Sequence, residues 1–166
     1  PCWDEDHEGT LFLHGRLWEE DKAKRGPKAP FSVTPFEPPV DELTDEFPLR
    51  LTTGRRLDSY NTGVQTGGYT SPLRRGETID LSPEDADRLG VVDDEVVRVT
   101  SRRGSLDVPV RVDRGLRPGL VFMTLHFPDQ VDTNILTIDA TDPKSGTAEF
   151  KASAVRIEKI SESVGA

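Results

Sequence analysis

The chain has 166 residues, of which 34% are hydrophobic, and its mean hydropathy of -0.53 predicts one small folded domain with segments that bury little. The formal net charge of -9 argues against binding to nucleic acid or to an anionic membrane surface, because phosphates attract basic surfaces. We find no run of about 20 apolar residues and no signal peptide, so we expect no membrane insertion and a cytoplasmic protein.

Cysteine and histidine are too few for the usual metal sites. The chain has one cysteine, Cys2, and three histidines, His7, His14 and His126, which lie far apart. This excludes an internal disulfide and a cysteine-ligated zinc or iron–sulfur site built from this chain alone. We therefore predict neither metal ligands nor catalytic residues here. The only methionine is Met123, so we expect the chain to be a piece of a longer protein.

The first part of the chain is predicted to be an extended arm. Six of the thirteen prolines lie between Pro27 and Pro48, and proline restricts the backbone and removes hydrogen-bond donors. We interpret residues 1–46 as a Pro-rich arm or linker from a preceding domain, which packs on a neighbour.

Short strands and one helix are predicted from residue 47 onward. Strands are expected at 48–53, 77–82, 119–127 and 152–160, with a hairpin over 91–112 whose valines alternate with polar residues. In "SPEDADRLG", Ser82 is the expected N-cap, Pro83 the first helical residue and Gly90 the C-terminal stop. These elements predict a mainly β protein, with a small barrel over 47–160 and a tail at 161–166.

Two polar stretches follow predicted strands, at 51–68 and 126–151. Glycines such as Gly54 let backbone N–H groups face a ligand, and the next two residues, Arg55 and Arg56, can clamp a phosphate. If both strands end on the same side of the barrel, the stretches form one cleft for a large polar ligand with phosphates. The alternative is that they only connect strands, since no dinucleotide or P-loop fingerprint occurs. His126 is open to a structural role or to ligand contact.

Four motifs follow one another along the chain: "FPLRLTTGRRLDSYNTGVQTG", "DLSPEDADRLGVVDDEVVRVTSRRG", "VFMTLHF" and "TNILTIDATDPKSGTAEFKASAVRIEKI". Their order resembles the C-terminal molybdopterin-dinucleotide-binding domain of the molybdenum and tungsten oxidoreductases, most closely that of formate dehydrogenase large subunits. The opening "PCWDEDHEGTLFLHGRLWEEDKAK" is similar to the segment that precedes this domain. The resemblance implies a six-stranded double-psi β-barrel with one or two short helices and an extended N-terminal arm.

The same resemblance implies a cofactor and the residues that hold it. The cofactor is bis(molybdopterin guanine dinucleotide) with molybdenum or tungsten. In the family, the strand end "TTGR" lies against the dinucleotide, and the following loop reaches the pterin and phosphates; Asn61 stands where a His is frequent. The implied cofactor-binding residues are Thr52, Thr53, Gly54, Arg55, Tyr60, Asn61, Thr62, Gly63, Thr66, His126, Asn134, Phe150 and Lys151.

The implied function is that of a cofactor-binding domain in a larger enzyme, most similar to formate dehydrogenase, which converts formate to carbon dioxide with two electrons passed on. Its partners would be upstream domains of the same polypeptide, where any iron–sulfur cluster and the metal ligand would lie, and possible electron-transfer subunits. The fragment alone is not expected to be active. The alternatives are a nitrate reductase domain and a stand-alone small β-barrel module without the cofactor.

Overall fold

The computed structural model describes residues 4–9, 31–56, 76–128 and 130–160. The chain divides into two compact units, Pro1–Glu37 and Pro38–Ala166. In the described part of the first unit, a turn near Asp4 is the main feature, with Asp6 N–H donating to the Asp4 carboxylate at 3.1 Å. Phe31, Val33 and Phe36 are exposed there. The second unit contains all the strands and helices described below.

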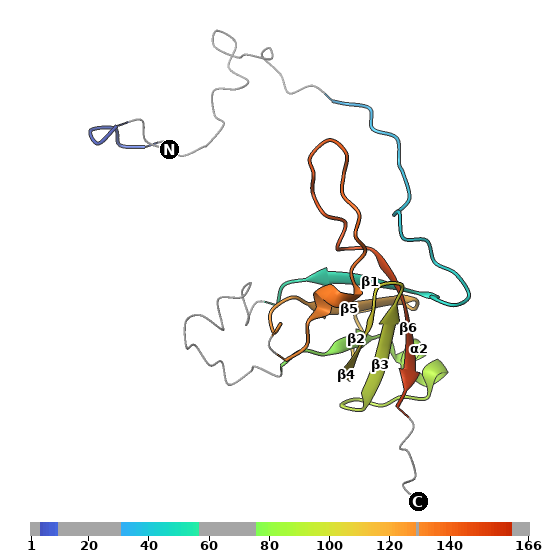
Figure 1. Ribbon diagram of the computed structural model, residues 1–166. Helices are drawn as coiled ribbons and strands as arrows, with labels where there is room; N and C mark the ends of the chain where they lie inside the picture. Colours follow the sequence, from blue (N-terminus) through green and yellow to red (C-terminus); the bar gives the residue numbers. More distant parts are fainter. Residues whose placement is uncertain (1–3, 10–30, 57–75, 129, 161–166) are drawn as a thin grey trace, which may run out of the picture. The chain divides into compact units, whose positions relative to one another are not determined.

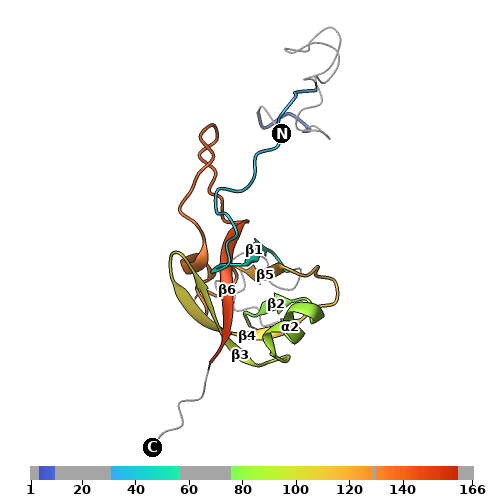
Figure 2. The same cartoon turned by 90° about the vertical axis from the view of Figure 1, so that its right-hand side faces the viewer.

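Six strands close into a barrel in the order β1-β5-β2-β4-β3-β6, as Figures 1 and 2 show. The strands are β1 (Leu49–Gly54), β2 (Ile79–Leu81), β3 (Val96–Ser101), β4 (Ser105–Val112), β5 (Leu120–Thr124) and β6 (Ser153–Lys159). Two neighbouring pairs are parallel, β1 with β5 and β2 with β4. The predicted six-stranded barrel and the hairpin of β3 and β4 are confirmed.

The barrel interior is filled by alternate residues of its strands. Each strand supplies two buried aliphatic side chains two positions apart, because successive side chains of a strand point to opposite faces. The residues are Leu49 and Leu51, Ile79 and Leu81, Val97 and Val99, Val108 and Val110, Val121 and Met123, and Val155 and Ile157. This closed apolar interior leaves polar side chains for the strand ends and the outer face.

One α-helix, α2 (Pro83–Leu89), follows β2 as predicted. Ser82 caps it by accepting a hydrogen bond from the Asp85 backbone N–H at 3.1 Å, and Gly90 ends it in the left-handed conformation with φ of 67°, where glycine is favoured. None of the helices in the described part of the chain has the length and apolar character needed to cross a bilayer.

Residues 41–47, which lead into β1, are bound to the barrel. The buried Asp41 carboxylate accepts a hydrogen bond from the Ala154 N–H at 2.6 Å and pairs with the Arg102 guanidinium. The Phe47 ring lies 4.9 Å from the Arg102 guanidinium and 5.4 Å from that of Arg156, which are cation–π distances. The entry to β1 therefore has its own contacts with β6 and with the turn that follows β3.

A long excursion joins β5 to β6. It begins with the 3₁₀ helix η1 (Thr133–Leu136), extends away from the barrel in Figure 1, and returns through an isolated bridge between Thr141 and Ala148. Phe150 and Lys151 lie at the end of this return, directly before β6. The excursion thus brings two distant parts of the sequence to the end of the barrel where β1 and β5 finish.

Candidate functional site

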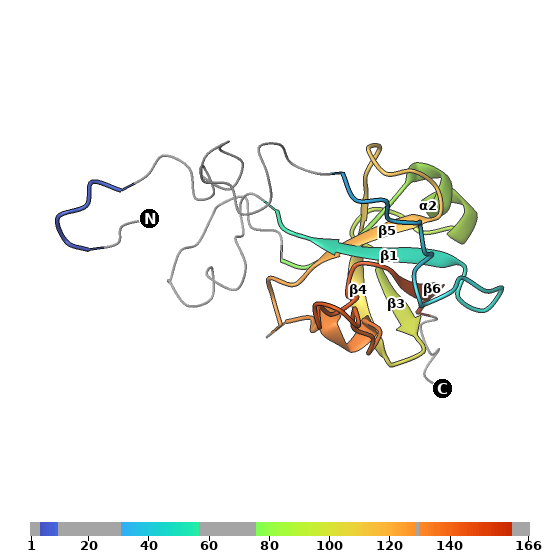
Figure 3. The ribbon, with the colours of Figure 1, turned by 90° about the horizontal axis from the view of Figure 1, so that it is seen from above.

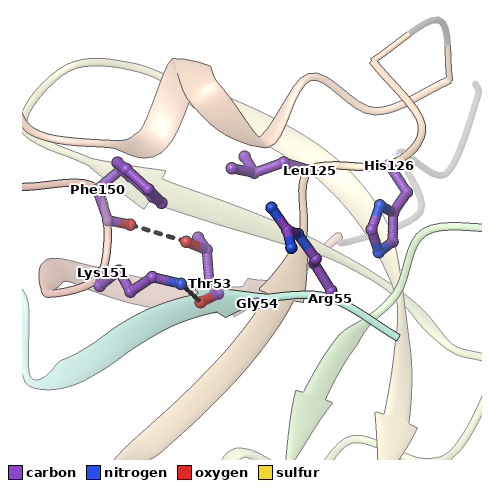
Figure 4. Close-up of a pocket in the computed structure, with 7 residues that line it drawn as sticks. All are labelled: Thr53, Gly54, Arg55, Leu125, His126, Phe150 and Lys151. Atoms are coloured by element: carbon purple, nitrogen blue, oxygen red, sulfur yellow. Dashed lines mark hydrogen bonds between the residues drawn. The ribbon is translucent and has the colours of Figure 1, made fainter. Parts of the chain in front are cut away.

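The carboxyl ends of β1 and β5 lie side by side and form one wall of a cleft. The two strands are parallel and paired from Arg50 with Leu120 to Gly54 with Thr124, and Figure 3 shows them next to each other. A cleft of about 440 Å³ opens beyond the last pair. Figure 4 shows its lining residues, which are Thr53, Gly54, Arg55, Leu125, His126, Phe150 and Lys151. Residues 53–55 of the first polar stretch and residues 126, 150 and 151 of the second therefore meet at one end of the barrel.

Gly54 is required here by a close approach. A Cβ atom at this position would lie 2.7 Å from Cε2 of the Phe122 ring on β5, well inside van der Waals contact. The Phe122 ring thus fills the space that a side chain at position 54 would need. The strand end of β1 is consequently bare backbone where it enters the cleft.

The return of the excursion is tied to β1 by two reciprocal hydrogen bonds. The Thr53 hydroxyl donates to the Phe150 carbonyl at 3.0 Å, and the Lys151 ammonium donates to the Thr53 carbonyl at 2.8 Å. Lys151 Nζ also lies 5.2 Å from the centre of the Phe150 ring. Figure 4 shows both bonds along one side of the cleft. An aromatic ring and a cation are therefore held at fixed positions beside Gly54.

The two neighbouring arginines have different surroundings. Arg55 lines the cleft, and Figure 4 shows its side chain rising between Leu125 and His126. The Arg56 guanidinium instead donates to the Thr78 hydroxyl at 2.6 Å and to the Asp80 carboxylate at 2.8 Å. The expectation that Arg56 clamps a phosphate together with Arg55 is wrong, because an almost fully buried carboxylate already holds it.

His126 joins the ends of β1 and β5. Its ring is buried, and Nε2 accepts a hydrogen bond from the Arg56 backbone N–H at 3.0 Å. Its own backbone N–H donates to the Thr124 hydroxyl at 3.2 Å. The side chain therefore has a structural contact and also lines the cleft, so both roles left open by the sequence are compatible with its position.

A buried carboxyl group, Glu77, lies behind this connection. It accepts hydrogen bonds from the Thr124 N–H at 2.8 Å and from the Thr124 hydroxyl. Burial raises the pKa of Glu77 above its ordinary value of 4.5, although the bonds from Thr124 and the positive charge of Arg56 oppose this shift. Glu77 thus secures the end of β5 with a group whose charged form is costly there.

A second, smaller hollow adjoins the cleft through Leu125. Its volume is about 260 Å³, and it is lined by Leu125, Pro128, Val131, Asp132, Thr133 and Asn134. Asn134 is exposed at the start of η1, where its side-chain oxygen accepts a bond from the Thr137 hydroxyl at 2.9 Å. The Thr133 hydroxyl is buried and has no hydrogen-bond partner among the described residues. The hollow therefore contains a polar group that a ligand or water could satisfy.

The structure gathers most of the predicted site residues that it describes. Thr53, Gly54, Arg55, His126, Phe150 and Lys151 line the cleft, and Asn134 lines the adjoining hollow. Thr52 is a half-buried residue of β1 and is not among the described residues that line either space. The predicted residues Tyr60, Asn61, Thr62, Gly63 and Thr66 lie outside the described residues. Within the described ranges, no cluster of three metal-ligating side chains occurs.

Sequence reasoning missed Leu125, Thr124 and Glu77. Leu125 lines both the cleft and the adjoining hollow. The sequence feature that could have indicated this is its position between the apolar strand and the polar stretch that begins at residue 126. Glu77 and Thr124 have no such signal, because each is a single polar residue at a strand end. Only the pairing of β1 with β5 and of β5 with β2 brings them together.

Comparisons with known proteins identify the family of this chain. The family model described as "Molydopterin dinucleotide binding domain" matches residues 49–154. F420-dependent formate dehydrogenase 2 subunit alpha of Methanococcus maripaludis is 41% identical over 164 residues, which cover 96% of this chain and 23% of that protein. The assimilatory nitrate reductase catalytic subunit of Bacillus subtilis is 37% identical over 96% of this chain and 22% of that protein.

A solved structure shares the fold. Acetylene hydratase from Pelobacter acetylenicus superposes with a TM-score of 0.62 at 19% sequence identity, over 89% of this chain and 23% of that one. At this identity the likeness concerns the fold alone. The chain thus spans about a quarter of the length of the relatives that it matches.

Proposed function

Because the chain belongs to the molybdopterin dinucleotide-binding domain family, we propose that it is the C-terminal cofactor-binding domain of a molybdenum or tungsten oxidoreductase. It would hold bis(molybdopterin guanine dinucleotide) in the cleft at the ends of β1 and β5. The observation that carries this proposal is the convergence of Arg55, Lys151 and Phe150 around the bare strand end at Gly54.

The residues of the cleft fit such a cofactor. Arg55 and Lys151 provide two cations for phosphate oxygens, while Phe150 and Leu125 provide an aromatic and an aliphatic surface for a ring system. The backbone of Gly54 lines the cleft, while the Phe122 ring occupies the side on which a Cβ atom would lie. The adjoining hollow adds Asn134 and the unpartnered Thr133 hydroxyl, so the donor set extends beyond the cleft itself.

The bound cofactor would supply the two-electron redox chemistry. The work of this chain is to bind and to orient. Lys151 is already held by the Thr53 carbonyl, which fixes the position of its charge, and Phe150 would exclude water from one side of the bound cofactor. Asn134 and Lys151 would donate to pterin or phosphate oxygens. Tyr60, Asn61, Thr62, Gly63 and Thr66 remain predicted contacts of the same site.

Formate dehydrogenase is the parent enzyme that we favour. The supporting observation is the 41% identity to a formate dehydrogenase alpha subunit over nearly the whole chain. Nitrate reductase is the second candidate, supported by the 37% identity to an assimilatory nitrate reductase. Residues that decide the substrate would lie upstream, together with the metal ligand and any iron–sulfur cluster.

The remaining parts of the proposal concern organisation and location. Residues 1–46 would be an arm from the preceding domain, 47–160 the barrel and 161–166 a tail. The partners would be upstream domains of the same polypeptide and electron-transfer subunits. A cytoplasmic location belongs to this proposal, and one relative, from Desulfovibrio desulfuricans, is by its name a periplasmic nitrate reductase. A stand-alone barrel module without the cofactor is the competing hypothesis.

Arg55→Ala and Asn134→Ala, each introduced into the longer polypeptide that contains this chain, test the proposal. Losing a charge-assisted or neutral hydrogen bond costs about 1 to 3 kcal/mol, so we expect a severalfold loss of retained cofactor. Metal analysis and the guanine nucleotide released on denaturation measure it. Arg98→Ala is the matched control, because Arg98 pairs with Asp107 on the exposed β3–β4 surface. Unchanged content in both site variants would refute the assignment.

A further inference from the structure

We propose that His126 is a positioning residue: its Nε2 atom replaces a backbone acceptor at the end of the β1–β5 ladder and holds Arg55 in the cleft. The part of this inference that concerns the geometry is independent of the proposed function. Only its consequence for the cofactor rests on that function. Three observations support it: the point at which the β1–β5 hydrogen bonds end, the other hydrogen bonds of His126, and the hydrogen bonds of Arg56.

The regular pairing of β1 with β5 ends at Gly54 and Thr124. Two residues beyond the end of β1, the Arg56 backbone N–H donates at 3.0 Å to the Nε2 ring nitrogen of His126, which lies two residues beyond the end of β5. An imidazole placed between two backbones holds them farther apart than a direct N–H···O=C bond, which spaces strands about 4.8 Å apart. The cleft opens at this point, between Arg55 and Leu125.

The backbone of His126 is itself fixed. Its N–H donates to the Thr124 hydroxyl at 3.2 Å, and the same hydroxyl donates its proton to the buried Glu77 carboxyl. A hydroxyl has one proton and two acceptor positions, so the bond to Glu77 turns a lone pair toward His126. Glu77 and Thr124 thereby place the ring, and the ring places the Arg56 N–H.

Arg56 is held at both ends, and this determines where Arg55 points. The backbone N–H of Arg56 is bound to His126, and its guanidinium is bound to Asp80 at 2.8 Å. Because neighbouring side chains of an extended chain point in opposite directions, securing Arg56 against Asp80 directs Arg55 to the other side. Figure 4 shows the Arg55 side chain inside the cleft, next to the His126 ring.

His126 Nε2 must be unprotonated, because it accepts the hydrogen bond from the Arg56 N–H. A neutral imidazole can accept at one ring nitrogen only if the other carries the proton, and an imidazolium cannot accept at all. The inference therefore predicts a neutral His126 with its proton on Nδ1. A glutamine retains an acceptor oxygen near the position of Nε2, whereas a leucine has similar bulk and no acceptor.

The first experiment examines the chain itself by NMR, labelled with ¹⁵N. In the unmodified chain we expect a pyridine-type shift for His126 Nε2 and a pyrrole-type shift for Nδ1. In His126→Leu the Arg56 amide should exchange with solvent about tenfold faster, as expected for a lost bond, and in His126→Gln it should stay near the original rate. The amides of Val99 and Ile157, in β3 and β6, report in the same spectra whether the barrel remains folded.

A pyrrole-type Nε2 in the unmodified chain, or equal Arg56 exchange in the two variants, would overturn the positioning role. If His126→Leu fails to fold, two measurements still decide the question. They are the ¹⁵N chemical shifts of the His126 ring in the unmodified chain and the Arg56 amide exchange rate of His126→Gln relative to the unmodified chain.

The second experiment places both variants in the longer polypeptide and measures retained guanine nucleotide. We expect a severalfold loss for His126→Leu and near-complete retention for His126→Gln. The two experiments separate the two ideas: normal NMR results with unchanged nucleotide in His126, Arg55 and Asn134 variants refute the proposed function and leave the geometric role intact.

Discussion

Each end of strand β5 is bound by a different buried carboxyl group, and the two groups differ in how well hydrogen bonds compensate their charge. At the start, Asp85 of α2 accepts the Gly119 N–H at 2.7 Å, the Ser82 hydroxyl at 2.9 Å and the Arg88 guanidinium at 2.7 Å. At the other end, Glu77 accepts the backbone N–H and the hydroxyl of Thr124. The first end lies by the helix, the second by the cleft.

The pKa values of these two groups move in opposite directions. Burial raises the pKa of Asp85, but the hydrogen bonds from Arg88, Gly119 and Ser82 outweigh it, so the net pKa lies below the ordinary value of 3.8. For Glu77, burial dominates, and the pKa lies above 4.5 despite the bonds from Thr124. At the helix end, the surroundings of Asp85 thus stabilise its charged form, whereas at the cleft end the surroundings of Glu77 do not fully compensate the cost of its charge.

The comparison shows that the carboxyl group whose charge is less well compensated lies at the cleft end of β5. A well-compensated carboxylate stabilises the strand start, and none of the described residues that it bonds lines the cleft. The less well-compensated Glu77 stands behind Thr124 and His126, which shape the cleft. Polar groups that reduce stability tend to be retained where a site needs them, so we expect substitutions at the two ends to separate stability from cofactor retention.

The largest effect is expected for Asp85→Ala. The change removes the acceptor of the Gly119 N–H, of the Ser82 hydroxyl proton and of the Arg88 guanidinium. With several bonds to one charged group lost, the free energy of unfolding should fall by about 3 kcal/mol. Urea denaturation of the chain measures this. Cofactor content of the longer polypeptide should change little at a temperature where the variant stays folded.

Glu77→Ala is the matched comparison, since it removes a buried carboxyl from the other end. We expect a smaller loss of stability, because ionised Glu77 is itself disfavoured by burial, together with reduced cofactor content. If Glu77→Ala destabilises the chain more than Asp85→Ala and leaves the cofactor untouched, the proposed division between the two ends is wrong.

A smaller effect is expected for Gly54→Ala at the cleft end. The new Cβ would lie 2.7 Å from the Phe122 ring, so the ring must move, and such overpacking typically costs about 1 to 3 kcal/mol. The added Phe122→Leu substitution removes the ring edge and should restore part of the loss. Urea denaturation of the two single variants and the double variant measures the coupling. Additive effects would show that Phe122 is not the reason for glycine at this position.

Part of this architecture could be predicted from local sequence. Ser82, Pro83 and Gly90 act within one helix, so their pattern predicted α2 and both of its ends. The alternating valines of the β3–β4 hairpin were equally informative, since strand alternation is a local property. The short strands also predicted a small barrel, and the family resemblance added its six-stranded form and the residues of the site, which no local pattern contains.

The remainder depends on which strands become neighbours. Arg55 and Arg56 are the same residue type in adjacent positions, and only the buried Asp80 on β2 distinguishes the cleft residue from the structural one. The role of His126 depends on the parallel pairing of β1 with β5, which places Arg56 within reach of its ring. Glu77 gave no signal, because a single carboxyl before a strand is common and its burial is a tertiary effect.

The smallest effect, and the most direct test of the comparison between the two ends, is on the pH dependence of stability. The folded-state pKa of Asp85 is lowered from 3.8, so its contribution to stability is present above pH 3.8 and disappears as the pH falls through the folded value. The folded-state pKa of Glu77 is raised from 4.5, so its contribution is complete below pH 4.5 and disappears as the pH rises through the folded value.

Asp85→Asn and Glu77→Gln remove each titration while keeping the size of the side chain. The free energy of unfolding, measured by urea denaturation from pH 3 to pH 8, should lose part of its acid-side decline in Asp85→Asn. In Glu77→Gln it should lose part of its decline above pH 4.5. The two difference curves, variant minus unmodified chain, therefore slope in opposite directions with rising pH, downward for Asp85→Asn and upward for Glu77→Gln. Curves that slope the same way would mean that the folded-state pKa values of both carboxyl groups are shifted in the same direction, and this result would contradict the proposed difference between the helix end and the cleft end.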